Sequence, residues 1–236
     1  MVSRNRAELD MVVAEIEAAS GRGFATTADV TDRTGVEAAV KAAEAALGPV
    51  SLLVNNAGRD VPFGPIGHVD PDDWWATHAI HVRGPLLFMS AVLPGMRQRG
   101  KGHIVNIASL GGQVVEPNMS AYAVGKATEI RLTQHVAAEC KGQGIAVFAI
   151  EPGTVITSMG EATLTNPEAR RWIPGGIAFL TSVQEAQRDP AVREAVFRRC
   201  GDMVAGLLSG RYDVLSGRYL EPGDDFDQLA RDAQVG

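Results

Sequence analysis

Hydrophobic positions along the chain fall alternately into helical spacing and short continuous runs. Leu9, Val13 and Ile16 repeat at helical spacing, and a second helical pattern covers about residues 32–47, after a short predicted strand at 23–30. Residues 50–58, 102–109 and 144–153 are apolar runs that end in Asn, Ser or Gly, which is typical of strands buried on both faces. Further helices are predicted to begin at Asp70-Pro71 and to cover 120–141 and 190–209, before a short strand in "LSGRYLEP".

This alternation of strand and helix predicts an α/β fold. We expect a doubly wound parallel sheet of the Rossmann-like kind, in three layers with helices on both faces. No linker or composition break divides the chain, so residues 1–236 are interpreted as a single domain. The stretch 157–189 is expected to be irregular, and we interpret about 158–189 as a lid over a substrate site.

Composition narrows the classes of partner. The net charge is −6 and the pI is about 5.4, which argues against a nucleic-acid partner. No apolar run approaches the roughly 20 residues of a membrane span, so we expect no membrane partner. Glu8 and Asp10 stand where a signal peptide would have its apolar core, and two cysteines suit a reducing compartment. We therefore expect a cytoplasmic protein.

Small and polar residues follow the predicted strands. They are Asp29, "NNAG" at 55–58, "ASLGG" at 108–112 and "EPGTVIT" at 151–157. Ligands of open α/β sheets bind beyond the carboxyl ends of the strands, and small residues let a flat ligand approach the backbone. Each segment alone is weak support, because ordinary turns have the same composition.

The segment "SAYAVGKAT" carries the sharper signal. Tyr122 and Lys126 lie four residues apart and so share one face of a helix. A free tyrosine is a poor base near neutral pH, and a neighbouring ammonium lowers the pKa of a phenol. Ser109, at the end of the preceding strand, could face the Tyr122 hydroxyl. The Tyr–Lys pair alone could be an amphipathic surface pair, but its order with Ser109, "NNAG" and "PGTVIT" is hard to attribute to chance.

In these residues the chain resembles the short-chain dehydrogenase/reductase family, from about Val2 to "LSGRYLEP". The matching pieces are "ADVTD", "LLVNNAG", "DDWW", "LPGMRQRGKGHIVNIAS", "YAVGK" and "IEPGTVITSM". The resemblance implies that Tyr122 is the general acid/base and that Ser109 holds the reacting oxygen. Lys126 would lower the pKa of the tyrosine and hold the nicotinamide ribose.

The resemblance also implies a cofactor site. Its residues would be Arg4, Asp29, Val30, Asn55, Ala57, Gly58, Tyr122, Lys126, Pro152, Gly153, Val155 and Thr157. Ser3-Arg4 occupies the corner that selects between the two dinucleotides, with a guanidinium suited to a 2′-phosphate and no carboxylate to repel it. We therefore expect NADP(H) in preference to NAD(H); the alternative is a solvent-facing arginine at a helix start.

His81 departs from the family pattern. It stands where the family has a catalytic asparagine, which holds a water in a proton relay to the lysine. We expect His81 to be a fourth catalytic residue in a modified relay, and the alternative is a tolerated change at a helix kink. His78 and His81 are three residues apart on a helix, but without further ligands at metal-binding spacing we expect no metal.

The family's glycine-rich phosphate loop, T-G-x-x-x-G-x-G, has no counterpart in this sequence. "GRGFAT" at 21–26 and "GQGIAV" at 142–147 follow helices and precede strands, the wrong order for a phosphate loop. We therefore expect an N-terminally truncated fold that lacks about 30–40 residues of a βαβ unit. The strands at 24–29 and 50–55 would then lose the neighbour between them.

The predicted function is an NADP-dependent oxidoreductase that interconverts a ketone or aldehyde and an alcohol by hydride transfer. The partner would be a small-molecule substrate, with an anionic end if Arg170 and Arg171 face the pocket instead of solvent. The resemblance implies a homo-oligomer, a tetramer or dimer formed through helices near 72–98 and 120–141. The alternative is a catalytically inert protein of the same fold that serves as a binding or assembly partner.

Overall fold

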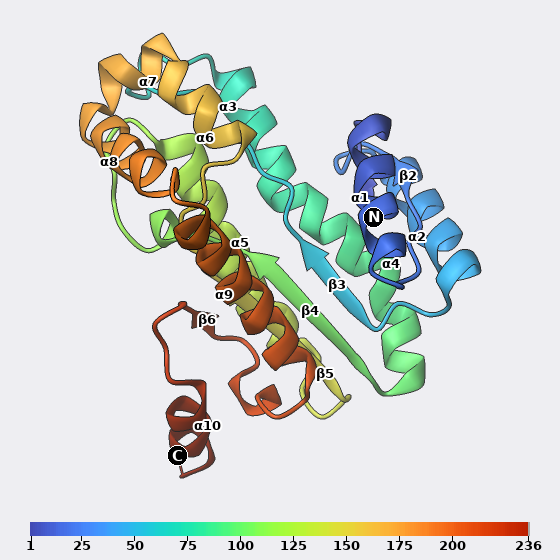
Figure 1. Cartoon of the computed structure of the whole chain (residues 1–236). Helices are drawn as coiled ribbons and strands as arrows, with labels where there is room; N and C mark the ends of the chain where they lie inside the picture. The colour runs from blue at the N-terminus through green and yellow to red at the C-terminus, as the bar shows by residue number, and fades with distance from the viewer. Residues whose placement is uncertain (236) are drawn as a thin grey trace.

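A computed structural model of the protein describes residues 1–235 as parallel sheets with helices packed on them (Figure 1). Its strands are β1 (Val2–Ser3), β2 (Thr26–Thr27), β3 (Leu52–Asn55), β4 (Gly102–Ile107), β5 (Ile145–Ile150) and β6 (Tyr219–Leu220). Its helices are α1 (Arg6–Ala18), α2 (Arg33–Leu47), α3 (Pro71–His78), α4 (Gly84–Arg99), α5 (Ser120–Glu139), α6 (Ser158–Thr165), α7 (Pro167–Trp172), α8 (Pro174–Ala186), α9 (Pro190–Leu208) and α10 (Phe226–Val235). The α/β class predicted from the sequence is confirmed.

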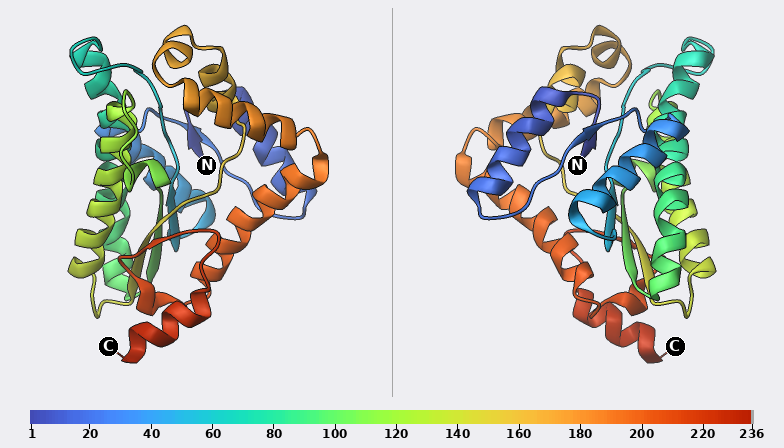
Figure 2. Two further views of the ribbon diagram at one scale, coloured as in Figure 1. Left: turned by 90° about the vertical axis from the view of Figure 1, so that its left-hand side faces the viewer. Right: turned by 90° about the vertical axis from the view of Figure 1, so that its right-hand side faces the viewer.

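The main sheet has the order β3-β4-β5-β6, and every pairing in it is parallel. Every residue of β4 and β5 is buried, as the continuous apolar runs predicted. Alternate residues of these strands enter two different cores. Ile104 and Val147 pack with α4 and α5 on one face, whereas Val105 and Phe148 pack with α9 on the other (Figure 2).

The N-terminal segment forms a lobe with a small sheet of its own. β1 and β2 pair only with each other among the described strands. Helix α2 of this lobe packs against α4, and its Val36 and Val40 belong to the same core as Ile104 of β4. The segments 24–29 and 50–55 therefore belong to two separate sheets. This agrees with the prediction that the strand between them is missing. One prediction is wrong here: β3 is not buried on both faces, because Val54 lies at this open edge with 41% of its surface exposed. The strand predicted at 23–30 is also shorter, with only Thr26–Thr27 paired.

The region 157–189 is helical, not irregular as the sequence suggested. α6, α7 and α8 occupy most of it, and proline opens both α7 and α8 at the first helical turn, where its missing N–H costs nothing. The Gln187 side chain fixes the segment to the loop after β5. It accepts a hydrogen bond from the Ile156 N–H (3.0 Å) and donates one to the Thr154 carbonyl (2.8 Å).

A continuous helical stretch, Pro71–Arg99, is long and apolar enough to cross a membrane. The sequence pattern had predicted no such run. The C-terminal part of this stretch is α4, whose Phe88, Met89, Val92 and Met96 pack in the core against the sheet. Burial within the fold therefore accounts for part of its hydropathy, since 44% of its apolar window is buried.

Candidate functional site

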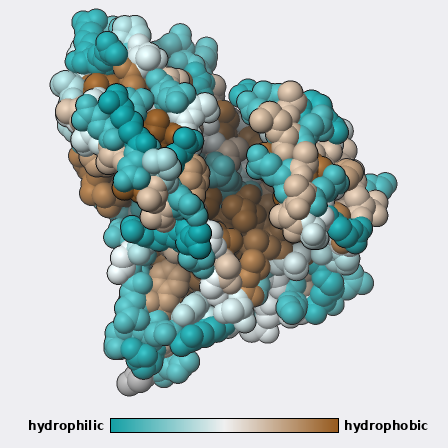
Figure 3. Space-filling model, in the orientation of Figure 1, coloured by the Kyte–Doolittle hydropathy of each residue, from teal (hydrophilic) through white to brown (hydrophobic). Residues whose placement is uncertain are grey.

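A groove separates the N-terminal lobe from the main sheet (Figure 3). Its volume is about 510 Å³. Residues 1–4 line one side of it, and residues 52–58, which are all of β3 and the loop after it, line the other. Apolar residues such as Val40, Phe88 and Val92 contribute to the lining. The groove therefore runs along the open edge of β3 and reaches the carboxyl end of that strand, where an α/β sheet binds a ligand.

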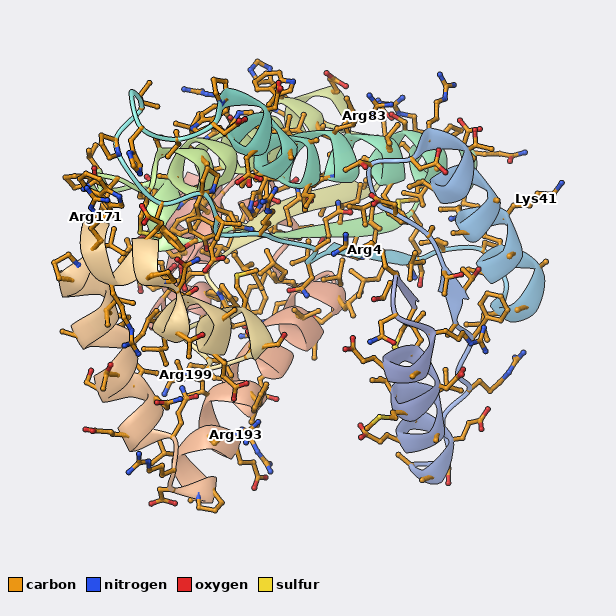
Figure 4. The ribbon with its side chains drawn as sticks, turned by 90° about the horizontal axis from the view of Figure 1, so that it is seen from above. Arg4, Lys41, Arg83, Arg171, Arg193 and Arg199 are labelled. Carbon is orange, nitrogen blue, oxygen red and sulfur yellow. The ribbon has the colours of Figure 1, made fainter. Side chains whose placement is uncertain are left out.

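Six of the predicted cofactor residues lie in this groove: Arg4, Asp29, Val30, Asn55, Ala57 and Gly58. Figure 4 shows Arg4 on the inner side of the N-terminal lobe, far from Arg171 on α7. Two of the six already have protein partners. The Asn55 amide donates to the Asn106 side chain (2.8 Å), and the Asp29 carboxylate accepts hydrogen bonds from Thr31, which lower its pKa.

The other predicted cofactor residues lie beyond the ends of β4 and β5. Pro152, Gly153 and Val155 follow β5 directly, and Thr157 precedes α6 as its N-cap residue. Gly153 has a φ of +80°, a left-handed conformation that favours glycine. These residues, with Tyr122 and Lys126, form a group distinct from the lining of the groove.

Ser109 and Tyr122 are brought together as predicted. Ser109 ends β4 in an extended conformation and caps the short helix Leu110–Gly112. Tyr122 lies in the first turn of α5, and both its ring and the Ser109 hydroxyl lie against Gly111, close enough for the hydroxyl to act on the pKa of the phenol. A substrate carbonyl could be held by two hydroxyl groups, that of Ser109 at the end of β4 and that of Tyr122 at the start of α5.

Lys126 is buried one turn after Tyr122, with 4% of its surface exposed. Its ammonium donates hydrogen bonds to the Ile107 carbonyl (2.6 Å) and to the Glu129 carboxylate (2.8 Å). The nitrogen lies 5.8 Å from the centre of the Tyr122 ring. Lys126 therefore contacts Glu129 more closely than it approaches Tyr122.

This arrangement corrects the expectation of a lowered tyrosine pKa. The pKa of Tyr122 is raised to about 12, chiefly by burial, although the Ser109 hydroxyl acts in the opposite direction. The carboxylates of Glu151, Glu129 and Asp60 contribute smaller increases to this value. The sequence argument failed mainly because it did not include the burial of the phenol, and it also left out these carboxylates.

His81 is completely buried in a π-helical turn, Ala79–Arg83, between α3 and α4. π-helical turns inside longer helices are frequent at functional sites. Its Nε2 lies 2.7 Å from the Arg59 carbonyl oxygen, and its ring meets the Tyr122 ring edge-on at 5.5 Å. His81 therefore lies beside Tyr122, and its two ring nitrogens face the Arg59 carbonyl and the Glu129 carboxylate. Its part in a proton relay to Lys126 stays a prediction.

Three acidic residues near Tyr122 were not anticipated from the sequence: Glu129, Glu151 and Asp60. The Glu151 carboxylate accepts hydrogen bonds from the Leu110 N–H and the Tyr219 hydroxyl. Asp60 accepts one from Thr163 of α6, and burial raises the pKa of its carboxyl. Helical spacing alone could have identified Glu129, because it lies three residues after Lys126.

Known proteins are similar to this chain in sequence. The family model for short chain dehydrogenases matches residues 1–168. A 2-(S)-hydroxypropyl-CoM dehydrogenase 3 of Xanthobacter autotrophicus is 39% identical over 223 residues, covering 89% of this chain and 84% of that protein. A protein named inactive 2-(S)-hydroxypropyl-CoM dehydrogenase 2, from the same organism, is 41% identical over 165 residues, 70% of each chain.

Solved structures share the fold over nearly the whole chain. A gluconate 5-dehydrogenase from Burkholderia cenocepacia, in complex with NADP and tartrate, has a TM-score of 0.75 and 26% identity. The match covers 94% of this chain and 82% of that one. In contrast, this chain spans 62% of the length of two Monascus short chain dehydrogenases that it matches at 33% identity.

Proposed function

Because the chain belongs to the short chain dehydrogenase family, a family of nicotinamide-dependent oxidoreductases, we propose that it interconverts a ketone or aldehyde and an alcohol with NADP(H). The observation that supports this best is the adjacent Ser109–Tyr122 pair at the carboxyl end of β4, with buried Lys126 one turn further along α5. In this proposal the cofactor supplies the hydride, and the protein manages the proton and the alignment.

Tyr122 acts as the general acid in reduction. Its phenol gives a proton to the carbonyl oxygen as that oxygen gains negative charge, while the Ser109 hydroxyl donates a hydrogen bond to the same oxygen. In alcohol oxidation the proton returns to Tyr122. Lys126, held by Ile107 and Glu129, would contact the ribose of the bound cofactor, and Gly153, Val155 and Thr157 would line its nicotinamide end.

The substrate proposed is a secondary alcohol and its ketone. The name of the 39% identical Xanthobacter protein describes a 2-hydroxypropyl group, which is a secondary alcohol. Arg170 does not support an anion site, because its Nε already donates to the Leu164 carbonyl (2.8 Å). Arg171 lies over the Trp172 ring (4.5 Å), and so the arginine pair gives no reason to expect an anionic substrate.

We expect Arg4→Ala to weaken NADPH binding roughly tenfold while leaving NADH binding nearly unchanged. Arg4 is exposed at the groove, and a hydrogen bond between charged groups contributes about 1.5–3 kcal/mol. Titration of both nucleotides against the wild type and the variant measures this, with Arg6→Ala as a matched control from the start of α1. Equal losses for NADPH and NADH would show that Arg4 does not contact the 2′-phosphate.

The raised pKa of Tyr122 predicts opposite pH dependence for the two directions. Alcohol oxidation needs the phenolate, and with a pKa of about 12 its fraction grows about tenfold per pH unit below that value. We therefore expect oxidation to accelerate from pH 7 to pH 10, whereas ketone reduction should not depend on Tyr122 ionisation in that range. Initial rates in both directions measure this, and an oxidation rate that levels off below pH 8 would contradict it.

Several properties of the whole protein belong to the same proposal: a single domain with 158–189 as a substrate lid, a cytoplasmic location, and assembly into a dimer or tetramer.

A second candidate is an inert protein of the same fold. The open groove between β1 and β3 and the inactive-named relative favour it. Assaying NADPH oxidation against a panel of ketones separates the two, since an inert protein binds without turnover.

A further inference from the structure

Glu129 is a buried carboxylate next to the proposed proton donor. Only 1% of its surface is exposed, and its Oε2 lies 2.8 Å from the Lys126 ammonium. Its second oxygen, Oε1, lies 3.9 Å from Nδ1 of His81. A buried carboxylate is costly unless it is paired, so its place between two basic side chains explains how the fold retains it.

The surrounding chain is shaped to keep this contact. Gly125 precedes Lys126 on α5, and a Cβ atom there would come within 3.0 Å of the His81 Cβ. Glycine at this position thus lets the His81 turn approach α5 closely enough to reach Glu129. The His81 Nε2 is fixed by the Arg59 carbonyl at 2.7 Å, and Nδ1 has no hydrogen-bond partner among the described side chains. The unpartnered nitrogen therefore faces Glu129.

We propose that Glu129 is a positioning residue: its carboxylate, held between Lys126 and His81, draws the Lys126 ammonium away from the Tyr122 phenol and makes that phenol a poorer proton acceptor. A paired ammonium and carboxylate act on Tyr122 as a dipole, which is much weaker than a lone cation at the same distance. Glu129 therefore makes Tyr122 less able to take a proton from an alcohol, in addition to the effect of burial. The meaning of this effect for turnover rests on the proposed function.

Other groups also face Tyr122 and keep their identity in the test. They are the carboxylates of Asp60 after β3 and Glu151 after β5, the Ser109 hydroxyl and the His81 ring. Glu129→Gln keeps the shape of the side chain and removes only its charge. Tyr122 should then feel the full charge of the Lys126 ammonium.

The test is the ionisation of Tyr122 in the ligand-free chain 1–236, followed by NMR with ¹³Cζ-labelled tyrosine. The chain has three tyrosines, so Tyr122→Phe assigns the signal. We expect Glu129→Gln to move the Tyr122 titration toward neutral pH by about one unit. Glu129→Asp, which keeps the charge, should restore most of the wild-type behaviour. The control is Glu139→Gln, which removes an exposed carboxylate from the same helix and should leave the Tyr122 titration unchanged.

An unchanged Tyr122 titration in folded Glu129→Gln overturns the proposal, as does an equal shift in Glu139→Gln. If Glu129→Gln does not fold, the test relies on Glu129→Asp, which keeps the negative charge. A Tyr122 titration that moves by about one pH unit in Glu129→Asp would contradict the proposal. The measurement needs neither cofactor nor turnover. It can therefore fail while NADPH-dependent ketone reduction is found, and it can succeed in a protein that reduces nothing.

Discussion

Replacing Tyr122 with phenylalanine is expected to lower the rate of ketone reduction roughly a thousandfold, because a positioned general acid contributes about 10²- to 10⁴-fold. The substitution removes one hydroxyl from a ring that packs edge-on against His81. Packing is therefore largely retained, and NADPH affinity should change less than about twofold. Steady-state kinetics of a form of the chain that carries an N-terminal phosphate-binding segment measure both quantities.

Tyr212→Phe is the matched control for this variant. The Tyr212 hydroxyl donates to Asp227 (2.9 Å) and has no contact with Ser109 or Lys126. Its loss should leave turnover unchanged. Wild-type activity in both Tyr122→Phe and Tyr212→Phe would show that the proton comes from another group. Asp60 would then be the next acid to test, because burial raises the pKa of its carboxyl.

The second large effect concerns cofactor binding by residues 1–236 alone. Arg4 and Asp29 could reach one end of a dinucleotide, and Lys126 and Thr157 the other. A pyrophosphate is normally held by the amides of a helix N-terminus that follows a glycine-rich turn, and no such sequence occurs in this chain. We expect dissociation constants for NADPH in about the millimolar range, where binding free energy is only about −4 kcal/mol.

Titration of the intrinsic or NADPH fluorescence measures this binding. A chain extended by a strand and a glycine-rich turn should bind far more tightly, because that strand could pair with the open edges of β1 and β3 across the groove. Saturable micromolar binding by 1–236 itself would contradict the prediction. It would mean that groove residues of this chain hold the phosphates in another way.

The main sheet was predictable because its signal is local. β4 and β5 are buried on both faces, and a strand of this kind can be recognised in the sequence as a continuous apolar run. The placement of Ser109 beside Tyr122 was predictable for a related reason, because the end of a strand and the start of the next helix meet at one edge of the sheet. Helical spacing placed Lys126 one turn further on, but it did not show that the ammonium is held by Glu129.

The charge state of the site was not predictable in the same way. The Tyr122 pKa depends on burial and on Glu151, Glu129 and Asp60, which come from three different segments of the chain. The region 157–189 failed for another reason. The sequence pattern there predicted no helix, but Pro167 and Pro174 open helices, and Asn166 caps α7 by accepting hydrogen bonds from the Glu168 and Ala169 N–H groups.

The most direct test of the proposed function is carbonyl-dependent oxidation of NADPH. A chain fitted with an N-terminal phosphate-binding segment is mixed with NADPH and a panel of ketones and aldehydes, and absorbance of the reduced nicotinamide is followed with Tyr122→Phe in parallel. We predict NADPH loss that depends on at least one carbonyl compound, formation of an equal amount of alcohol, and almost no reaction in the variant. NADPH that binds tightly but is oxidised by no carbonyl compound would contradict the account and identify the protein as an inert member of its family.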